Sequence, residues 1–132
     1  MTNANIVPVG SLTKAFTGVG VLRLYEQGKI GLNDTVDKHV NDILMKMNSS
    51  TLETIWKNSS INNVTIYQLL HMTGGIQDYR DDDVKNWTIY HPDEDYSPLD
   101  YLYESNKTFY CTPGTCMVYS SIGFELLGLV LA

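Results

Sequence analysis

The sequence predicts one mainly α-helical domain. A chain of 132 residues is long enough for a single domain and leaves no room for a second of ordinary size. Apolar residues recur at helical spacing in several segments, most clearly in 11–27 and 120–132. The sequence contains no internal repeat, so a solenoid is excluded.

Composition limits the classes of partner. Hydrophobic residues make up 43% of the chain and charged residues 18%, as is typical of a globular protein. The net charge of -6 comes without a basic stripe, which argues against a nucleic-acid partner. No run approaches the about eighteen apolar residues that a membrane span needs. Residues 1–10 have neither the basic nor the apolar region of a signal peptide.

The first predicted helix covers 11–27 and is expected to be central and buried. Its apolar residues at helical spacing form one face: Leu12, Ala15, Phe16, Val19 and Leu22. Val21 and Leu24 add apolar character on another side, and a helix that is apolar nearly all round is a buried one. Gly18 and Gly20 lower helix propensity, so we expect them to admit close approach by another element.

The next segments alternate turn, helix and loop. A turn over 28–34 leads to a second helix over 35–47. The polar segment 48–63 is expected to be a surface loop. The two tryptophans, Trp56 and Trp87, have polar neighbours in the sequence and are expected to be partly exposed.

The second half of the chain begins with a short helix that Thr65 is expected to cap and that stops at the glycine pair 74–75. Segment 77–98 mixes charges, aromatic residues and prolines without periodicity, which predicts an exposed irregular excursion. A short helix over 101–110, a Pro-Gly turn and a last helix over 120–132 complete the chain.

Asparagine usage indicates a compartment. Six residues head Asn-x-Ser/Thr triplets without a central proline: Asn33, Asn48, Asn58, Asn63, Asn86 and Asn106. Chance would give roughly one or two such triplets. The excess predicts N-glycosylation of a protein that is secreted or lies in the lumen of the secretory or lysosomal route of a eukaryote. The alternative is a proteome rich in Asn, Ser and Thr, which produces such triplets freely.

The two cysteines bracket a turn. Cys111 and Cys116 flank Thr-Pro-Gly-Thr, and Pro followed by Gly at the centre of four residues is typical of a type II turn. Such a turn brings its flanks together, so a local disulfide is expected in an oxidising compartment. Two unpaired thiols are the alternative. A structural zinc site needs four ligands, and the sequence has no second pair.

Ser11 and Lys14 are the first candidates for chemistry. Residues three apart at a helix start share one face, with Cβ atoms about 5–6 Å apart, so an amine lies beside a hydroxyl. Ser11 also falls at the positive end of the helix, where free N–H groups stabilise an oxyanion. A lysine serves as a base at neutral pH when it is desolvated, and burial of 11–27 would desolvate Lys14. The alternative is a serine N-cap followed by an exposed lysine.

Tyr119 is the second candidate. It stands between the Pro-Gly turn and the last predicted helix, where a hydroxyl can point into a cleft and relay protons. The chain has nine tyrosines, so an ordinary interfacial tyrosine is the alternative.

Five blocks of sequence resemble, in order, the serine β-lactamase and penicillin-binding-protein-like hydrolases, on the side of class C β-lactamases, D-Ala-D-Ala carboxypeptidases and esterases. The blocks are 10–14 (GSLTK), 28–34 (GKIGLND), 64–75 (VTIYQLLHMTGG), 113–114 (PG) and 119–128 (YSSIGFELLG). The resemblance implies a serine hydrolase that forms an acyl-enzyme on amide or ester bonds of a small peptide or acyl compound. It implies no metal and no organic cofactor.

The resemblance also implies a role for each candidate. Ser11 would be the nucleophile, Lys14 its proton acceptor and Tyr119 the partner base that protonates the leaving group. Where the family usually has asparagine two residues after the tyrosine, this chain has Ser121, which would contact substrate. A hydroxyl offers one donor where an amide offers two, so the change favours an esterase or peptidase over a true β-lactamase.

The sequence also departs from the family by what it lacks. The third family motif, a Lys/His-x-Gly on a strand, does not follow Tyr119, and the strands of the main sheet are missing. The expected fold is therefore a mainly α fragment of the α/β (α+β) β-lactamase/transpeptidase-like fold, a partial domain over 1–132 with little or no activity of its own. The last helix runs to Ala132 without a C-cap, which also predicts a partial chain. The alternative function is a non-catalytic secreted glycoprotein that uses the helical scaffold as a binding module.

Overall fold

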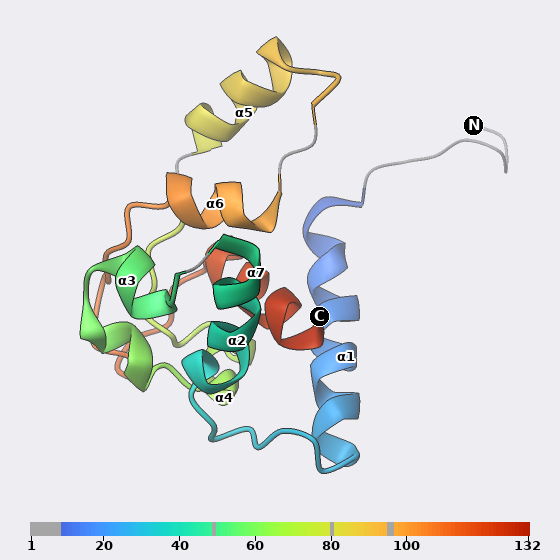
Figure 1. Cartoon of the computed structure of the whole chain (residues 1–132), viewed down its shortest axis with the longest axis vertical. Helices are drawn as coiled ribbons and strands as arrows, with labels where there is room; N and C mark the ends of the chain where they lie inside the picture. Colours follow the sequence, from blue (N-terminus) through green and yellow to red (C-terminus); the bar gives the residue numbers. More distant parts are fainter. Residues whose placement is uncertain (1–8, 49, 80, 95–96) are drawn as a thin grey trace, which may run out of the picture.

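The chain folds as an assembly of helices (Figure 1). The computed structural model describes residues 9–48, 50–79, 81–94 and 97–132. Over these ranges no strand forms, and extended backbone pairs only in two isolated antiparallel bridges, Thr35–Thr65 and Ile76–Phe109. No helix in the same ranges has both the length and the apolar character needed to cross a membrane.

The described ranges contain seven α-helices and two 3-10 turns, joined by turns and loops. The α-helices are α1 (Thr13–Glu26), α2 (Val36–Asn48), α3 (Leu52–Trp56), α4 (Ile66–Leu70), α5 (Asp81–Tyr90), α6 (Pro98–Glu104) and α7 (Ser121–Leu131). The 3-10 turns are η1 (Gly10–Leu12) and η2 (Ser59–Asn63). The helices predicted over 35–47 and 120–132 correspond to α2 and α7.

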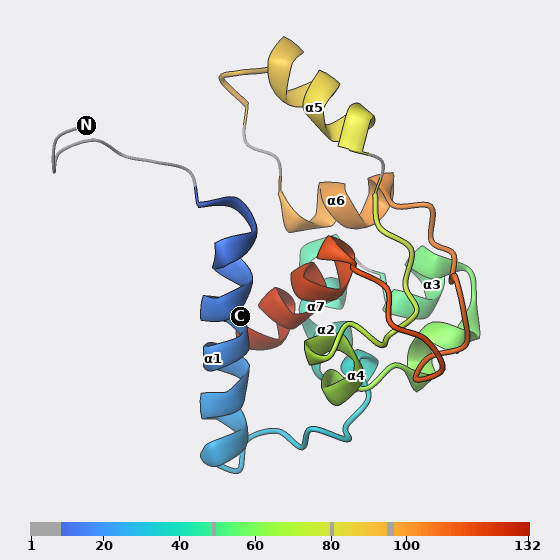
Figure 2. The ribbon, with the colours of Figure 1, turned by 180° about the vertical axis from the view of Figure 1, so that it is seen from behind.

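Helix α7 lies at the centre of the fold. It packs against α1, α2, α4 and α6, and both views show it surrounded by these elements (Figures 1 and 2). Its buried residues are Ile122, Gly123, Leu126, Leu127 and Leu129. A helix that is apolar on every side loses most by facing water, which explains why this one occupies the core.

Helix α1 lies along one flank, so the prediction that it is central and buried was wrong (Figure 1). The only buried residue of α1 is Val21. The large apolar face predicted for it is exposed: Leu12 by 68%, Phe16 by 75%, Val19 by 58% and Leu22 by 44%. Apolar residues on several sides of a helix do not reveal which side a neighbour will cover.

Gly20 of α1 lies against the last residue of α7. A Cβ on Gly20 would lie 2.9 Å from the side chain of Leu131, closer than real Cβ contacts allow. The expectation that a glycine of this helix admits close approach is therefore confirmed. Gly20 thus faces the end of α7, Val21 is buried, and the larger apolar stripe of α1 remains exposed.

The segment predicted as a surface loop over 48–63 is instead part of the core. It forms α3 and η2, and its buried residues are Leu52, Ile55, Trp56 and Ile61. Trp56 is only 2% exposed, so the expected exposure of this tryptophan was wrong, whereas Trp87 is half-buried. The apolar residues 52, 55 and 56 have helical spacing within a polar background, and Thr51 caps the helix by accepting the Thr54 N–H.

Local capping explains the helices of the second half. Thr65 and Gln68 form a capping box at the start of α4, which confirms the expected cap at Thr65. A second capping box, from Ser97 and Asp100 with Pro98 in the first turn, starts α6. This helix ends at Glu104, so the helix predicted over 101–110 was wrong in both bounds.

The irregular excursion predicted over 77–98 was wrong in part, because it contains α5. This helix lies beyond α6, away from the rest of the fold in both views (Figures 1 and 2). Its exposed residues include Ile89 and Tyr90, at 70% and 78%. The sequence of this short helix mixes charged and aromatic residues without a clear helical period, which is why the pattern gave no signal.

A matched pair of leucine substitutions tests the central position of α7. Leu126 is fully buried and Leu12 is 68% exposed. We expect Leu126→Ala to lower the free energy of unfolding by about 2–5 kcal/mol, because it leaves a cavity in the core. Leu12→Ala should change it by less than about 0.5 kcal/mol. Urea unfolding followed by circular dichroism measures both, and equal losses would contradict this packing.

Candidate active site

Ser11 lies in η1, the 3-10 turn that leads directly into α1. The preceding Gly10 has φ +52, in the left-handed region that glycine adopts at little cost. A Cβ there would meet nothing within 4 Å, so the backbone conformation and not the space requires glycine. The turn leaves the Ser11 side chain exposed at the positive end of α1, where the first N–H groups have no acceptor within the helix.

Four predicted residues converge beside this turn. The Ser11 Oγ and the Tyr119 hydroxyl oxygen lie 2.5 Å apart, although the residues are 108 positions apart in the chain. The Lys14 ammonium donates to the Ser11 Oγ at 3.3 Å and to the Ser121 Oγ at 3.2 Å. Lys14 therefore bridges the starts of α1 and α7, and one amine contacts both serine hydroxyls.

Aromatic rings cover part of the Lys14 amine. The Lys14 Nζ lies 4.9 Å from the centre of the Tyr119 ring and 5.9 Å from the centre of the Phe124 ring. Both distances allow a cation–π attraction, which favours a cation at this position. Lys14 is half-buried, so the full burial expected from a central helix is not found.

The same amine acts on Tyr119. The side chain of Tyr119 is 54% exposed. The neighbouring Lys14 ammonium, and after it the hydrogen bond with Ser11, hold the pKa of Tyr119 below its ordinary value. Both interactions favour the phenolate, since a nearby cation and a donated hydrogen bond stabilise the charged form. Tyr119 is therefore suited to accept and return a proton.

Two carboxylates lie behind the site. Burial, and then the charge of Asp78, raise the pKa of the half-buried Glu125, whereas Lys14 acts in the opposite direction. The Asp78 Oδ1 accepts the backbone N–H groups of Tyr79 at 3.1 Å and of Ile122 at 3.2 Å. Asp78 thus holds the start of α7, the end of the helix that carries Ser121.

Sequence reasoning missed Asp78, Phe124 and Glu125. A signal existed for Glu125, because residues four apart on a helix are neighbours and Glu125 follows Ser121 by four. Asp78 gave no signal, since its partner Ile122 lies 44 positions further on.

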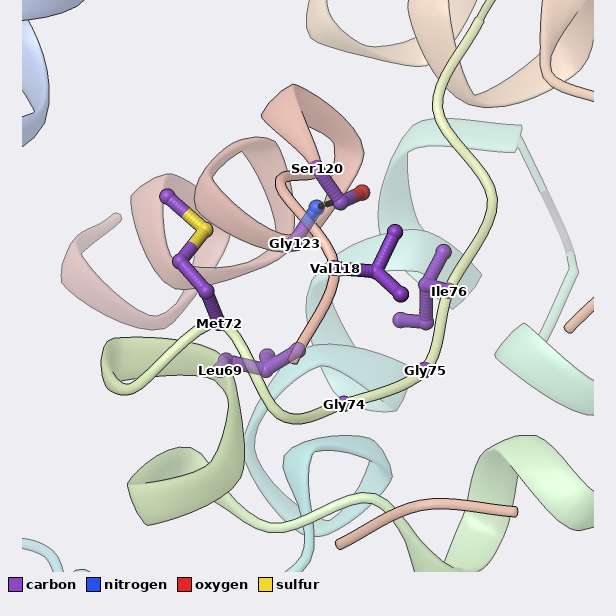
Figure 3. A pocket seen from close by; sticks show the side chains of 8 residues that line it. All are labelled: Leu69, Met72, Gly74, Gly75, Ile76, Val118, Ser120 and Gly123. Atoms are coloured by element: carbon purple, nitrogen blue, oxygen red, sulfur yellow. Dashed lines mark hydrogen bonds between the residues drawn. The ribbon is translucent and has the colours of Figure 1, made fainter. Parts of the chain in front are cut away.

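The start of α7 is fixed by its own cap. Ser120 is 5% exposed, and its Oγ accepts the Gly123 N–H at 3.2 Å (Figure 3). A cavity of about 10 Å³ lies below, lined by Leu69, Met72, Gly74, Gly75, Ile76, Val118, Ser120 and Gly123. This volume suits at most one water molecule, so the cavity is part of the packing under Tyr119 and not a substrate pocket.

The described part of the chain contains no group of three or more His, Cys, Asp or Glu residues that could hold a metal ion. Cys111 and Cys116 form a disulfide. The turn between them has Gly114 at φ +85, as a type II turn requires.

A family model described as Beta-lactamase matches residues 1–132. This chain belongs to the beta-lactamase family. Among curated relatives, it is 35% identical over 125 residues to Protein flp of Staphylococcus aureus (strain MRSA252), covering 93% of this chain and 22% of that protein. It is 26% identical over 127 residues to Penicillin-binding protein 4* of Bacillus subtilis (strain 168), covering 96% of this chain and 25% of the other.

Two solved structures have a similar fold in this region. A D-stereospecific amidohydrolase from Streptomyces sp. matches with a TM-score of 0.73 and 26% identity, over 95% of this chain and 36% of that one. A penicillin-binding protein from Bacillus halodurans matches with a TM-score of 0.61 and 25% identity, over 89% and 33%. The predicted fold class, a mainly helical part of the beta-lactamase fold, is confirmed.

The coupling between Lys14 and Tyr119 can be tested by titration. In Lys14→Met, we expect the pKa of Tyr119 to rise toward about 10, the value of an ordinary tyrosine, because the neighbouring cation is gone. The measurement is phenolate absorbance near 295 nm, taken as the difference from the same protein carrying Tyr119→Phe. Lys29→Met, at an exposed lysine, is the control and should leave the titration unchanged. An unshifted Tyr119 in Lys14→Met would contradict the coupling.

Proposed function

We propose that this chain carries the acylation site of a serine hydrolase that acts on amide or ester bonds. The observation that carries the proposal is the 2.5 Å contact between Ser11 and Tyr119 with the Lys14 amine 3.3 Å from the same Ser11 Oγ. A nucleophile within hydrogen-bond reach of a base, with a third group orienting the pair, is the arrangement that covalent catalysis needs. Membership of the beta-lactamase family supports this reading.

The chemistry follows from the four side chains. The Ser11 Oγ attacks the carbonyl carbon while its proton passes to the Tyr119 phenolate, which the Lys14 ammonium stabilises. The backbone N–H of Ser11, at the positive end of α1, helps to stabilise the oxyanion. Tyr119 then protonates the leaving group. In the second step it takes a proton from the water that attacks the acyl-enzyme and passes that proton to the Ser11 Oγ as the acyl group leaves. The hydrogen bonds with Lys14 and Ser11 hold the pKa of Tyr119 below its ordinary value, which supports this exchange.

Ser121 suggests the substrate class. Its Oγ lies 3.2 Å from the Lys14 Nζ, so it accepts from the catalytic amine and has one hydrogen to donate to a substrate. An amide side chain at this place would offer two. We therefore propose a small peptide or acyl ester as substrate, hydrolysed in a peptidase-like or esterase-like reaction. A D-stereospecific amidohydrolase and penicillin-binding proteins among the similar proteins support this class.

We also propose that the 132 residues by themselves have little or no hydrolytic activity. The chain spans 22% of Protein flp and 36% of the Streptomyces amidohydrolase. No Lys- or His-x-Gly triplet follows Tyr119 in this sequence, and the resemblance assigns that triplet to one wall of the cleft.

Covalent labelling tests the nucleophile. A fluorophosphonate probe should label the protein in its full natural length, and Ser11→Ala should reduce labelling at least about a hundredfold, because the attacking oxygen is removed. Ser59→Ala, at an exposed serine outside the site, is the matched control and should label like the unsubstituted protein. Gel fluorescence and peptide mapping by mass spectrometry measure the result.

Two outcomes would count against the proposal. Equal labelling of the Ser11→Ala and control proteins would refute the nucleophile assignment. No labelling by fluorophosphonate or penicillin probes in the natural full-length protein would favour the alternative, a non-catalytic secreted glycoprotein that keeps the scaffold as a binding module.

We propose in addition that the protein is secreted or luminal and carries N-linked glycans. Five of the six triplet asparagines have exposed side chains: Asn33, Asn58, Asn63, Asn86 and Asn106. Asn48 differs, because it is half-buried, its Nδ2 donates to the Tyr103 hydroxyl and its Oδ1 is buried. A glycan on the Asn48 Nδ2 would separate α2 from Tyr103, so we propose that this triplet is unused. The disulfide supports an oxidising compartment.

Glycan mapping tests this assignment. After expression through a eukaryotic secretory route, enzymatic release in ¹⁸O water should mark the exposed asparagines and leave Asn48 unmarked. Asn48→Gln should leave the number of glycans unchanged, whereas Asn63→Gln should remove one glycan. A marked Asn48 in folded protein would contradict the assignment.

A further inference from the structure

Tyr119 is held in place by its backbone. It lies between the turn that precedes it and Ser120, the N-cap of α7, and its side chain is 54% exposed. An exposed ring makes too few contacts to fix its hydroxyl 2.5 Å from Ser11. The position of the hydroxyl therefore depends on the backbone on both sides of Tyr119. Ser120 and Asp78 fix the start of α7 on one side, and segment 110–118 lies on the other.

Segment 110–118 is tied to the glycine-containing segment 72–75. Three backbone hydrogen bonds join them: the Tyr110 N–H to the Gly75 oxygen (2.8 Å), the Gly114 N–H to the Thr73 oxygen (2.7 Å) and the Val118 N–H to the Met72 oxygen (2.8 Å). The last of these bonds lies directly next to Tyr119. The Gln77 N–H continues this ladder by donating to the Thr108 oxygen at 3.0 Å, and these bonds all lie outside the helices.

The disulfide supplies a covalent constraint. Cys111 and Cys116 lie between the outermost bonds of this ladder and close a loop whose other side chains are mostly exposed. The loop sits directly on Gly75, which has φ +68 and where any Cβ would overlap the carbonyl oxygen of Cys111. The loop therefore buries few side chains. The disulfide joins its two ends, and its Cys111 carbonyl packs against Gly75.

The residue that receives the last bond is in an uncommon conformation. Met72 has φ +56, in the left-handed region that residues with side chains rarely adopt. Such a conformation persists where the surroundings determine it, and here the Met72 oxygen accepts the Val118 N–H. If segment 110–118 were released, Met72 would be free to relax and the bond next to Tyr119 would be lost.

We propose that the Cys111–Cys116 disulfide is the positioning device that holds Tyr119 against Ser11, and that its reduction separates the two hydroxyls while the helical core persists. A dithiol delivers two electrons and two protons, giving two cysteine thiols and an oxidised dithiol. The core should persist because a short closed loop constrains the unfolded chain less than a long one. The consequence for catalysis rests on the proposed function, whereas the positioning does not.

The test is the Tyr119 titration in a protein without the disulfide. In Cys111→Ser/Cys116→Ser, we expect the pKa of Tyr119 to return toward about 10, because the phenol has left Ser11 and Lys14. Helix content by circular dichroism should stay within about a tenth of the original value. Met117→Ala removes a 78% exposed side chain from the same segment while leaving the disulfide, and it should not move the titration.

Two further experiments disturb the disulfide loop in other ways. Dithiothreitol followed by alkylation of the folded protein should reproduce the shift without any substitution, and Gly75→Ala should produce it with the disulfide intact. A Tyr119 that keeps its low pKa after reduction would overturn the proposal. Loss of the helices on reduction would also overturn it, because the disulfide would then stabilise the whole fold. A shift as expected, in a protein whose Ser11 takes no fluorophosphonate, would refute the proposed function and leave the positioning intact.

Discussion

The close packing of α1 against α7 is the constraint on which the candidate site depends. Ser11 stands at the start of α1 and Ser121 at the start of α7, and Lys14 joins the two by hydrogen bonds. Further along the pair, the side chain of Leu131 lies against Gly20. A glycine there leaves room for the Leu131 side chain, so α1 and α7 are in contact at the site and again at the end of α7.

The packing of α1 against α7 also determines which groups surround the Lys14 amine. Lys14 extends from the side of α1 that faces α7, so its amine reaches two serine hydroxyls and lies near two aromatic rings. Glu125 is also on α7, and its proximity to Lys14 acts on the pKa of its carboxyl. Ser121 has a defined part in this arrangement, because a hydroxyl at that place accepts from Lys14 without filling the space that a longer amide would occupy.

Much of the fold could be predicted from local signals. The cap at Thr65, the Pro-Gly turn and the spacing of α2 and α7 each depend on residues close together in the chain. The spacing of Ser11 and Lys14 is also local, and a hydrogen bond joins them. Tyr119 could be placed beside them only through the family resemblance, because no local rule relates residues 108 positions apart.

The wrong predictions share a physical cause. Apolar periodicity reveals that a helix has an apolar stripe, but not whether a neighbour covers that stripe. Phe16 was therefore expected inside and is 75% exposed, while Trp56 was expected near the surface and is 2% exposed. Burial depends on what the rest of the chain brings to each side, and this information lies outside any short window of sequence.

The outward stripe of α1 has a mechanical consequence. Contiguous apolar surface of this kind is a place where other protein surfaces associate. The stripe lies on the same rigid helix that begins beside Ser11, and a helix advances by about 1.5 Å per residue. A contact made on Leu12, Phe16 and Val19 would therefore act on the helix whose first turn follows Ser11, and a shift of about 1.5 Å along that helix would lengthen the 2.5 Å contact between Ser11 and Tyr119.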